Sequence, residues 1–186
     1  MKNYFKRTMI TAVALMAFGS TVFAQNTVQV GGEAMYPMKD IVDNAVNSAD
    51  HTTLVAAVKA AGLVQALKGT GPFTVFAPTN AAFDKLPAGT VATLLKPENK
   101  DQLTKVLTYH VIAGKYDSEA LKKAIKAGKG EAKLKTVSGD MLSFMMNGPM
   151  NIVMKDETGN LATISTYDVY QSNGVINVIE SVLLPL

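Results

Sequence analysis

The stretch that most constrains the fold is residues 70–87, TGPFTVFAPTNAAFDKLP, because it specifies a strand, a stop and a helix in succession. Residues 73–76 are aromatic or β-branched, too few for a helix and apolar on both faces, which predicts a buried strand. Pro78 has no N–H to donate, so the strand is expected to stop there. Thr79 occupies a typical N-cap position, and the apolar residues after it predict a short helix that ends at Pro87. The stretch is a core element with no visible chemistry.

The first 24 residues have the three parts of a secretory signal: a basic start, an apolar run and a small-residue cleavage site that ends at Ala24. The apolar run is shorter than the roughly 20 residues that span a bilayer. We therefore expect cleavage after Ala24 and a location in the periplasm or outside the cell. Residues 25–36 are polar and contain two glycines, which favours a spacer before a domain at 37–186.

Composition narrows the possible functions. The net charge of +3 arises from 18 basic and 15 acidic residues, and three of the basic ones lie in the predicted signal, which leaves a neutral mature chain. Arg7 is the only arginine, so the mature chain has no guanidinium for bidentate binding of phosphate or base edges. The absence of cysteine excludes disulfides, thiolate nucleophiles and zinc–sulfur sites.

The order of predicted elements indicates an α+β fold. Short helices are expected between residues 37 and 67, at 90–95 and at 99–108, followed by a strand from Tyr109 to Ile112 and a helix from Ser118, its expected N-cap, to Gly128. From residue 131 the apolar period changes to two, and Asn147-Gly148 and Asn173-Gly174 are turn signals between strands. Helices followed by successive strands are typical of α+β proteins.

Three segments, in order, resemble the fasciclin domain: the central stretch, LTYHVIAGKY (107–116) and NGVINVIESVLLP (173–185). The resemblance implies a wedge-shaped β-sandwich with N-terminal helices packed on it. It also implies a non-catalytic adhesion or matrix-interaction module that needs no cofactor. The chain departs from the family pattern at Asn177, where family members often have histidine.

The two histidines are the residues best suited to act as a base near neutral pH. The resemblance implies that Tyr109 and His110 are chiefly structural, with partner contact as the alternative reading. His51 lies in a helix-start context, which favours local capping. No Gly-x-Ser-x-Gly elbow or pair of histidines at ligand spacing is present, so neither a hydrolase nor a histidine-ligated metal centre is expected.

A methionine cluster on the hairpin near residue 148 leaves a second function open. Thioethers are soft ligands suited to Cu(I), and copper is conceivable outside the cytoplasm. Core packing is the simpler interpretation, because Met146, Met150 and Met154 fall on the same strand faces as Phe144 and Ile152, where methionine fills irregular gaps. The alternative function is therefore a binding protein for a small ligand or a soft metal. The methionines concerned are Met141, Met145, Met146, Met150 and Met154.

Two surface features are candidate partner sites. Six lysines fall within residues 122–135, and Lys122, Lys123 and Lys126 lie on the polar face of the predicted helix. Such a face is usually only solvated, but the alternative is an electrostatic binding site for acidic polysaccharide, lipid headgroups or nucleic acid. The resemblance implies a second site at Asp168 and Val169, which match an Asp-Ile pair implicated in integrin binding in animal relatives. A turn with an Asx motif is the structural reading of that segment.

Overall fold

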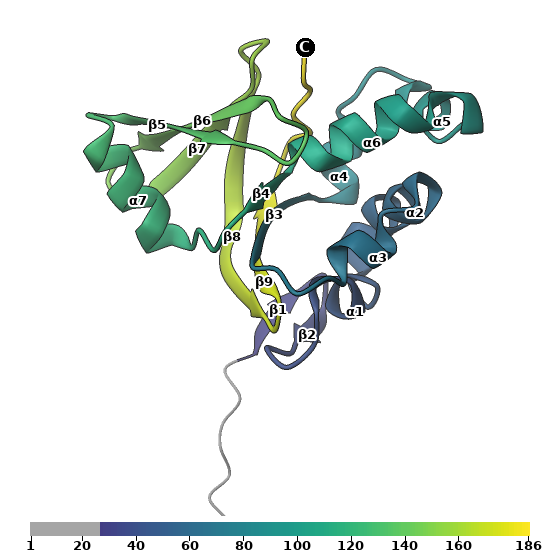
Figure 1. Ribbon diagram of the computed structural model, residues 1–186, viewed down its shortest axis with the longest axis horizontal. Helices are drawn as coiled ribbons and strands as arrows, with labels where there is room; N and C mark the ends of the chain where they lie inside the picture. The colour runs from purple at the N-terminus through teal and green to yellow at the C-terminus, as the bar shows by residue number, and fades with distance from the viewer. Residues whose placement is uncertain (1–26) are drawn as a thin grey trace, which may run out of the picture.

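The computed structural model describes residues 27–186, and Figure 1 shows them as a curled sheet flanked by helices. Within these residues, seven strands form one sheet in the order β4-β3-β9-β8-β7-β6-β5. β3 and β9 are parallel, and the other neighbours are antiparallel. The predicted α+β class is confirmed. The strands are β3 (Phe73–Pro78), β4 (Val111–Ala113), β5 (Glu131–Lys135), β6 (Met141–Asn147), β7 (Asn151–Lys155), β8 (Leu161–Gln171) and β9 (Gly174–Ile179).

The helices fall into two groups. The first six lie together beside β3 and β9, whereas α7 lies apart against β5 and β6 (Figure 1). None of the helices in residues 27–186 is long and apolar enough to cross a membrane. The helices are α1 (Ile41–Ala45), α2 (Thr52–Ala61), α3 (Val64–Leu67), α4 (Asn80–Asp84), α5 (Thr90–Leu94), α6 (Lys100–Tyr109) and α7 (Ser118–Ala127), with 3-10 turns at Ala49–His51 and Pro97–Asn99.

The central stretch folds as its sequence predicts. β3 ends at Pro78, and the Thr79 hydroxyl oxygen accepts a hydrogen bond from the Ala82 N–H at 3.2 Å, which caps α4. Gly71, just before β3, has a φ of +59°, and a Cβ there would lie 2.1 Å from the carbonyl oxygen of Asn173. The approach of this turn to the β8–β9 connection therefore requires glycine.

Because successive strand residues point to opposite faces, β3 and β9 contribute to two separate cores. The sheet-side core lies inside the curl of the sheet, under α7. It comprises Phe76, Tyr109, Ile112, Leu121, Ile125, Ala132, Leu142, Phe144, Ile152, Met154, Ala162, Ile164, Ile179 and Leu183. The helix-side core lies under α1 to α6. It comprises Val30, Met35, Ile41, Leu54, Ala57, Ala61, Val75, Ala77, Ala82, Phe83, Leu94, Leu103, Val106, Leu107, Val111, Val169, Ile176, Val178 and Val182.

The segment expected to be a spacer is partly folded. β1 (Val28–Val30) and β2 (Glu33–Met35) form an antiparallel hairpin. Val30 and Met35 are buried in the helix-side core, so the hairpin packs onto the domain. Two consecutive glycines supply the positive φ values of its turn, which explains why a composition typical of a linker encodes a tight hairpin. The predicted signal, residues 1–24, lies outside the described residues.

Three element boundaries differ from the sequence predictions. Asp117, rather than Ser118, caps α7, because its carboxylate accepts the Ala120 N–H at 2.9 Å. Tyr109 ends α6 instead of beginning a strand, and β4 begins at Val111. The segment around Asp168 is a part of β8 rather than a turn, with register irregularities on either side of Thr166.

Candidate functional site

Tyr109 and His110 lie inside the protein at the junction of α6 and β4. Tyr109 is fully buried, and its hydroxyl donates to the carbonyl oxygen of Met141 at 3.0 Å. Burial raises the pKa of the Tyr109 hydroxyl, so it stays a neutral donor. The rings of the two residues meet edge to face, with centroids 6.3 Å apart. In the folded domain, both side chains connect segments of the chain and neither is presented to a partner.

His110 makes a hydrogen bond with each ring nitrogen. Nδ1 lies 2.8 Å from the carbonyl oxygen of Val106, and Nε2 lies 3.1 Å from the backbone N–H of Leu183. A carbonyl can only accept and an N–H can only donate, so the ring is neutral, with its proton on Nδ1. Burial lowers the pKa of His110 to about 4, consistent with this state. The residue therefore joins α6 to the C-terminal segment and has no free nitrogen for catalysis or metal binding.

His51 does not cap its helix, contrary to the sequence prediction. Its side chain makes no capping bond, and its Nδ1 pairs with the Ser48 hydroxyl at 2.8 Å. The cap comes from α4, where Asn80 accepts the N–H of Thr53 at 3.0 Å. Nε2 of His51 is buried without a hydrogen bond in the described structure, and burial lowers the pKa of the ring.

Asp168 and Val169 occupy an irregular part of β8. Asp168 has a φ of +59°, and its carboxylate accepts hydrogen bonds from the Ser118 N–H at 2.7 Å and from the Ser118 hydroxyl at 2.5 Å. Val169 is only 1% exposed and packs in the helix-side core. Asn177 holds the irregularity in place, because its side-chain oxygen accepts the Asp168 N–H at 3.1 Å. The segment fixes the start of α7 to the sheet.

The methionine hairpin does not gather its sulfur atoms on one face. Met154 is fully buried in the sheet-side core and Met146 packs against it, whereas Met141 and Met145 belong to the opposite set of alternating positions on β6. Met150 lies in the turn and is 67% exposed. The residues thus divide between core packing and surface. Among residues 27–186, no group of three or more His, Asp or Glu side chains is placed to hold a metal ion.

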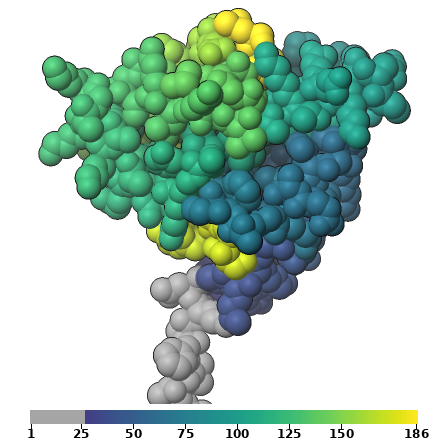
Figure 2. Space-filling view, viewed as in Figure 1, coloured from purple at the N-terminus to yellow at the C-terminus, as the bar shows by residue number. Residues whose placement is uncertain are grey.

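The lysines predicted on the polar face of α7 are at the surface. Lys123 and Lys126 are exposed and make no ion pair in the described structure, while Lys122 pairs with Glu119 at 3.3 Å. Together with Ala120, these four residues line a shallow depression of about 450 Å³. Leu121 and Ile125 are buried on the opposite face of the helix. Figure 2 shows that this part of the chain forms a projecting edge of the molecule.

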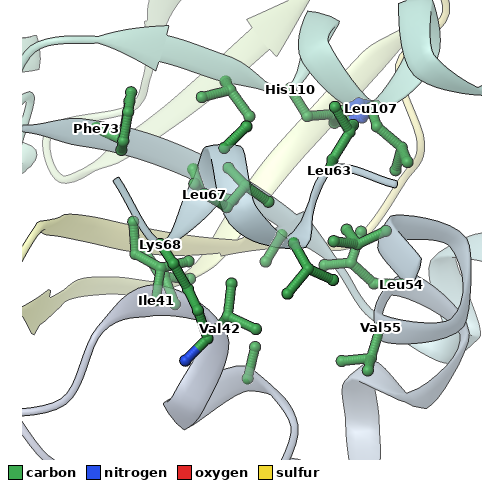
Figure 3. A pocket seen from close by; sticks show the side chains of 18 of the residues that line it. Ile41, Val42, Leu54, Val55, Leu63, Leu67, Lys68, Phe73, Leu107 and His110 are labelled. Carbon is green, nitrogen blue, oxygen red and sulfur yellow. The ribbon is translucent and has the colours of Figure 1, made fainter. Parts of the chain in front are cut away.

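A pocket that the sequence analysis missed lies among the helices. It has a volume of about 340 Å³ and is bounded by α1, α2, α3, α6 and β3 (Figure 3). Its walls are mainly aliphatic, and His110 closes one end with both nitrogens already hydrogen-bonded. Helical periodicity identified the apolar faces of these helices, but a gap between such faces depends on how the helices are placed. No single segment carries that signal.

The structure is a small α+β domain. The side chains of Tyr109, His110 and Asp168 form hydrogen bonds that join distant segments of this domain to one another. The fasciclin-domain model matches residues 49–185, so the chain belongs to the fasciclin-domain family. Members of this family are non-catalytic, and the expectation of a non-enzymatic domain agrees with that. The resemblance to the fasciclin domain, which the sequence analysis based on three short motifs, is thus confirmed.

The chain is similar to bacterial and animal proteins. It is 49% identical to protein sll1483 of Synechocystis sp. over 146 residues, which are 78% of this chain and 73% of that protein. It is 35% identical to the cell surface glycolipoprotein MPB83 of Mycobacterium bovis over 167 residues, 87% of this chain and 68% of that one.

A solved structure supports the fold. The FAS1 domain pair from the insect cell adhesion molecule fasciclin I superposes with a TM-score of 0.70 at 20% sequence identity. The match covers 80% of this chain and 52% of the insect chain, so this protein spans about half of that structure.

Proposed function

We propose that this protein is a secreted, non-catalytic adhesion or matrix-interaction module that binds acidic polysaccharide through the lysine face of α7. The proposal rests on Lys123 and Lys126. Both side chains are exposed beside a shallow depression, and neither makes an ion pair within residues 27–186. The cell-surface and cell-adhesion names of relatives support a location outside the cytoplasm. Export would follow from the predicted signal, with the mature chain beginning at Gln25.

The lysine face suits a flexible polyanion better than a compact ligand. Single exposed ion pairs contribute about 0–1 kcal/mol, so useful affinity requires several contacts at once. Lys129, just after α7, is also exposed and extends this positive charge. Lys133 and Lys135 are exposed too, but they alternate with residues that pack under α7 and therefore lie on the opposite face of β5. An extended chain of repeated acidic groups can contact several of these lysines together, and its binding should weaken with salt because exposed charges are screened. Tyr109, His110 and Val169 have no part in this proposal because they are buried.

The test compares two double variants of equal charge change. Lys123→Ala with Lys126→Ala removes the proposed contacts, whereas Lys96→Ala with Lys100→Ala removes two exposed lysines next to other helices. Binding to dextran sulfate and to uncharged dextran is measured by titration calorimetry. We expect the first variant to bind dextran sulfate about tenfold more weakly and the second to bind like wild type. Equal weakening by both variants would show non-specific charge attraction and contradict the proposal.

Export is tested separately. Mass spectrometry of the protein recovered from its own host should give a chain that starts at Gln25, and fractionation should place it outside the cytoplasm. An intact chain that begins at Met1 would contradict the export part of the proposal and leave the polysaccharide part to its own test.

A further inference from the structure

The pocket among the helices has the size and chemistry of a ligand site. Its volume of about 340 Å³ lies at the lower end of the roughly 300–1,000 Å³ range of small-molecule pockets. Figure 3 shows Leu63 and Leu67 from one side of the cavity, Val55 from α2 and Phe73 from β3 around it. Exposed lining residues such as Val46 and Val137 show that the pocket opens to the surface rather than lying closed within the core.

Apart from the exposed Lys59, the polar side chains of the lining already have partners. Both nitrogens of His110 are hydrogen-bonded, and the Thr108 hydroxyl donates to the Thr104 carbonyl oxygen at 2.7 Å. Lys68 forms ion pairs with Asp40 at 3.2 Å and with Asp43. A ligand inside the pocket thus meets aliphatic side chains and no buried group that is free to form a hydrogen bond with it. The part of the ligand that enters must be hydrocarbon, because an unpaired buried polar group is costly.

The walls permit entry from the surface. α3, on one side of the pocket, spans only four residues, and none of them is fully buried. Val46 and Val137, both in the lining, are 45% and 50% exposed and place apolar surface at the rim. Lys59, also in the lining, is exposed and makes no described ion pair. The rim can therefore accommodate a polar or anionic end group that stays in water.

We propose that this pocket binds a single aliphatic chain, as in a medium-chain fatty acid, with its carboxylate at the rim. A water molecule takes up roughly 30 Å³ of the liquid, and a methylene group is of similar size. A pocket of about 340 Å³ therefore holds a chain of about eleven carbon atoms. Burial of the chain removes apolar surface from water, which supplies the affinity. This site is independent of the lysine face of α7, so the Lys123→Ala, Lys126→Ala variant should bind such a chain like wild type.

A series of straight-chain carboxylates tests the size argument. Hexanoate to tetradecanoate are titrated below their micellar concentrations by calorimetry. Each added methylene should tighten Kd by about fourfold while the chain still fits, and the gain should stop near eleven carbons. Decanol should also bind, because the chain carries the affinity. Absence of saturable binding, failure of decanol to bind, or affinity that keeps rising through tetradecanoate would overturn the proposal.

A matched pair of variants tests the location. Val55→Phe places a larger side chain in the pocket, whereas Val91→Phe makes the same change on α5, outside the lining. Both valines are half-buried. We expect the first to weaken decanoate binding at least tenfold and the second to leave it unchanged. Equal binding by both would place the ligand elsewhere.

A direct measurement on the unaltered protein keeps the test decisive if Val55→Phe does not fold. In nuclear magnetic resonance spectra, decanoate should show intermolecular contacts to the methyl groups of Leu63 and Val55. It should show none to Leu142, which lies in the sheet-side core. Contacts to Leu142, or none to the pocket methyls at saturation, would overturn the location.

Discussion

On one face of β3 and β9, the sheet-side core buries Phe76, Leu142 and Phe144 with 0% exposure, and the two phenylalanine rings lie 5.3 Å apart. On the other face, the helix-side core encloses a pocket of about 340 Å³. The same two strands thus separate a filled interior from a hollow one. A filled core loses contacts with any change in volume, whereas a hollow core can absorb added atoms. We infer that the sheet side holds the fold together and the helix side has room for a ligand.

The largest expected effect is the removal of an aromatic ring from the filled core. Phe144→Ala should lower the free energy of unfolding by about 3–5 kcal/mol, because it leaves a cavity among fully buried side chains. Leu63→Ala, in the pocket wall, should cost less than about 2 kcal/mol because Leu63 is half-buried and already adjoins empty space. Urea unfolding of both variants measures the difference. Equal losses would break the contrast between the cores.

Acid should destabilise the protein through its two buried histidines, His51 and His110. His110 is hydrogen-bonded to one residue of each core, Val106 and Leu183. Burial lowers the pKa of His110 to about 4 and also lowers that of His51. The unfolded chain therefore takes up protons at a higher pH than the folded one. Stability is fully present above about pH 6.5 and is lost as pH falls toward 4, by about 1.4 kcal/mol for each unit of pKa difference.

Unfolding free energies at pH 7.5, 5.5 and 4.5 test this expectation. The lowered pKa values of Asp40 and Asp156 act in a different window, because their contribution is lost only as pH falls below about 4. His110→Gln keeps hydrogen-bonding capacity but does not titrate, so its stability should fall less between pH 6.5 and 4. If the stability of His110→Gln fell with pH as much as that of the wild type, protonation of His110 would not be a cause of the acid destabilisation.

The smallest expected effect comes from adding atoms to each core. Ala162 and Ala77 are strand residues with 1% and 4% exposure, on the sheet side and the pocket side respectively. Ala162→Leu should cost about 1–3 kcal/mol because the filled core must shift to admit it. Ala77→Leu should cost less than about 1 kcal/mol because the added carbons enter the pocket. Thermal unfolding of the pair gives the comparison, and a larger loss in Ala77→Leu would show that the pocket is not available to side chains.

Local signals predicted much of the fold. The buried strand, its end at Pro78 and the Thr79 cap were all correct, because propensity, a missing N–H and a cap depend on neighbouring residues. The sequence predictions failed where a segment distant in sequence determines the local structure. α2 is capped by Asn80 from α4, and the apparent spacer is a hairpin because Val30 and Met35 find a core to enter.

The candidate sites divide in the same way. The exposed face of α7 followed from its periodicity, since Leu121 and Ile125 at a spacing of four leave the lysines outside. The pocket did not follow, because helix faces enclose space only through their relative positions. Nor did the sequence show that Asp168 holds Ser118 across 50 positions of the chain.

By itself, the sequence determined the buried strand β3 and its end at Pro78, the Thr79 cap of α4, and the motifs that place the chain in the fasciclin-domain family. These depend on interactions within a few residues, which each segment carries with it. Tertiary structure alone decided which core each face of β3 enters, that both nitrogens of His110 are satisfied by Val106 and Leu183, and that the helix side stays hollow. Those outcomes depend on contacts between distant segments, and such contacts exist only once the chain has folded.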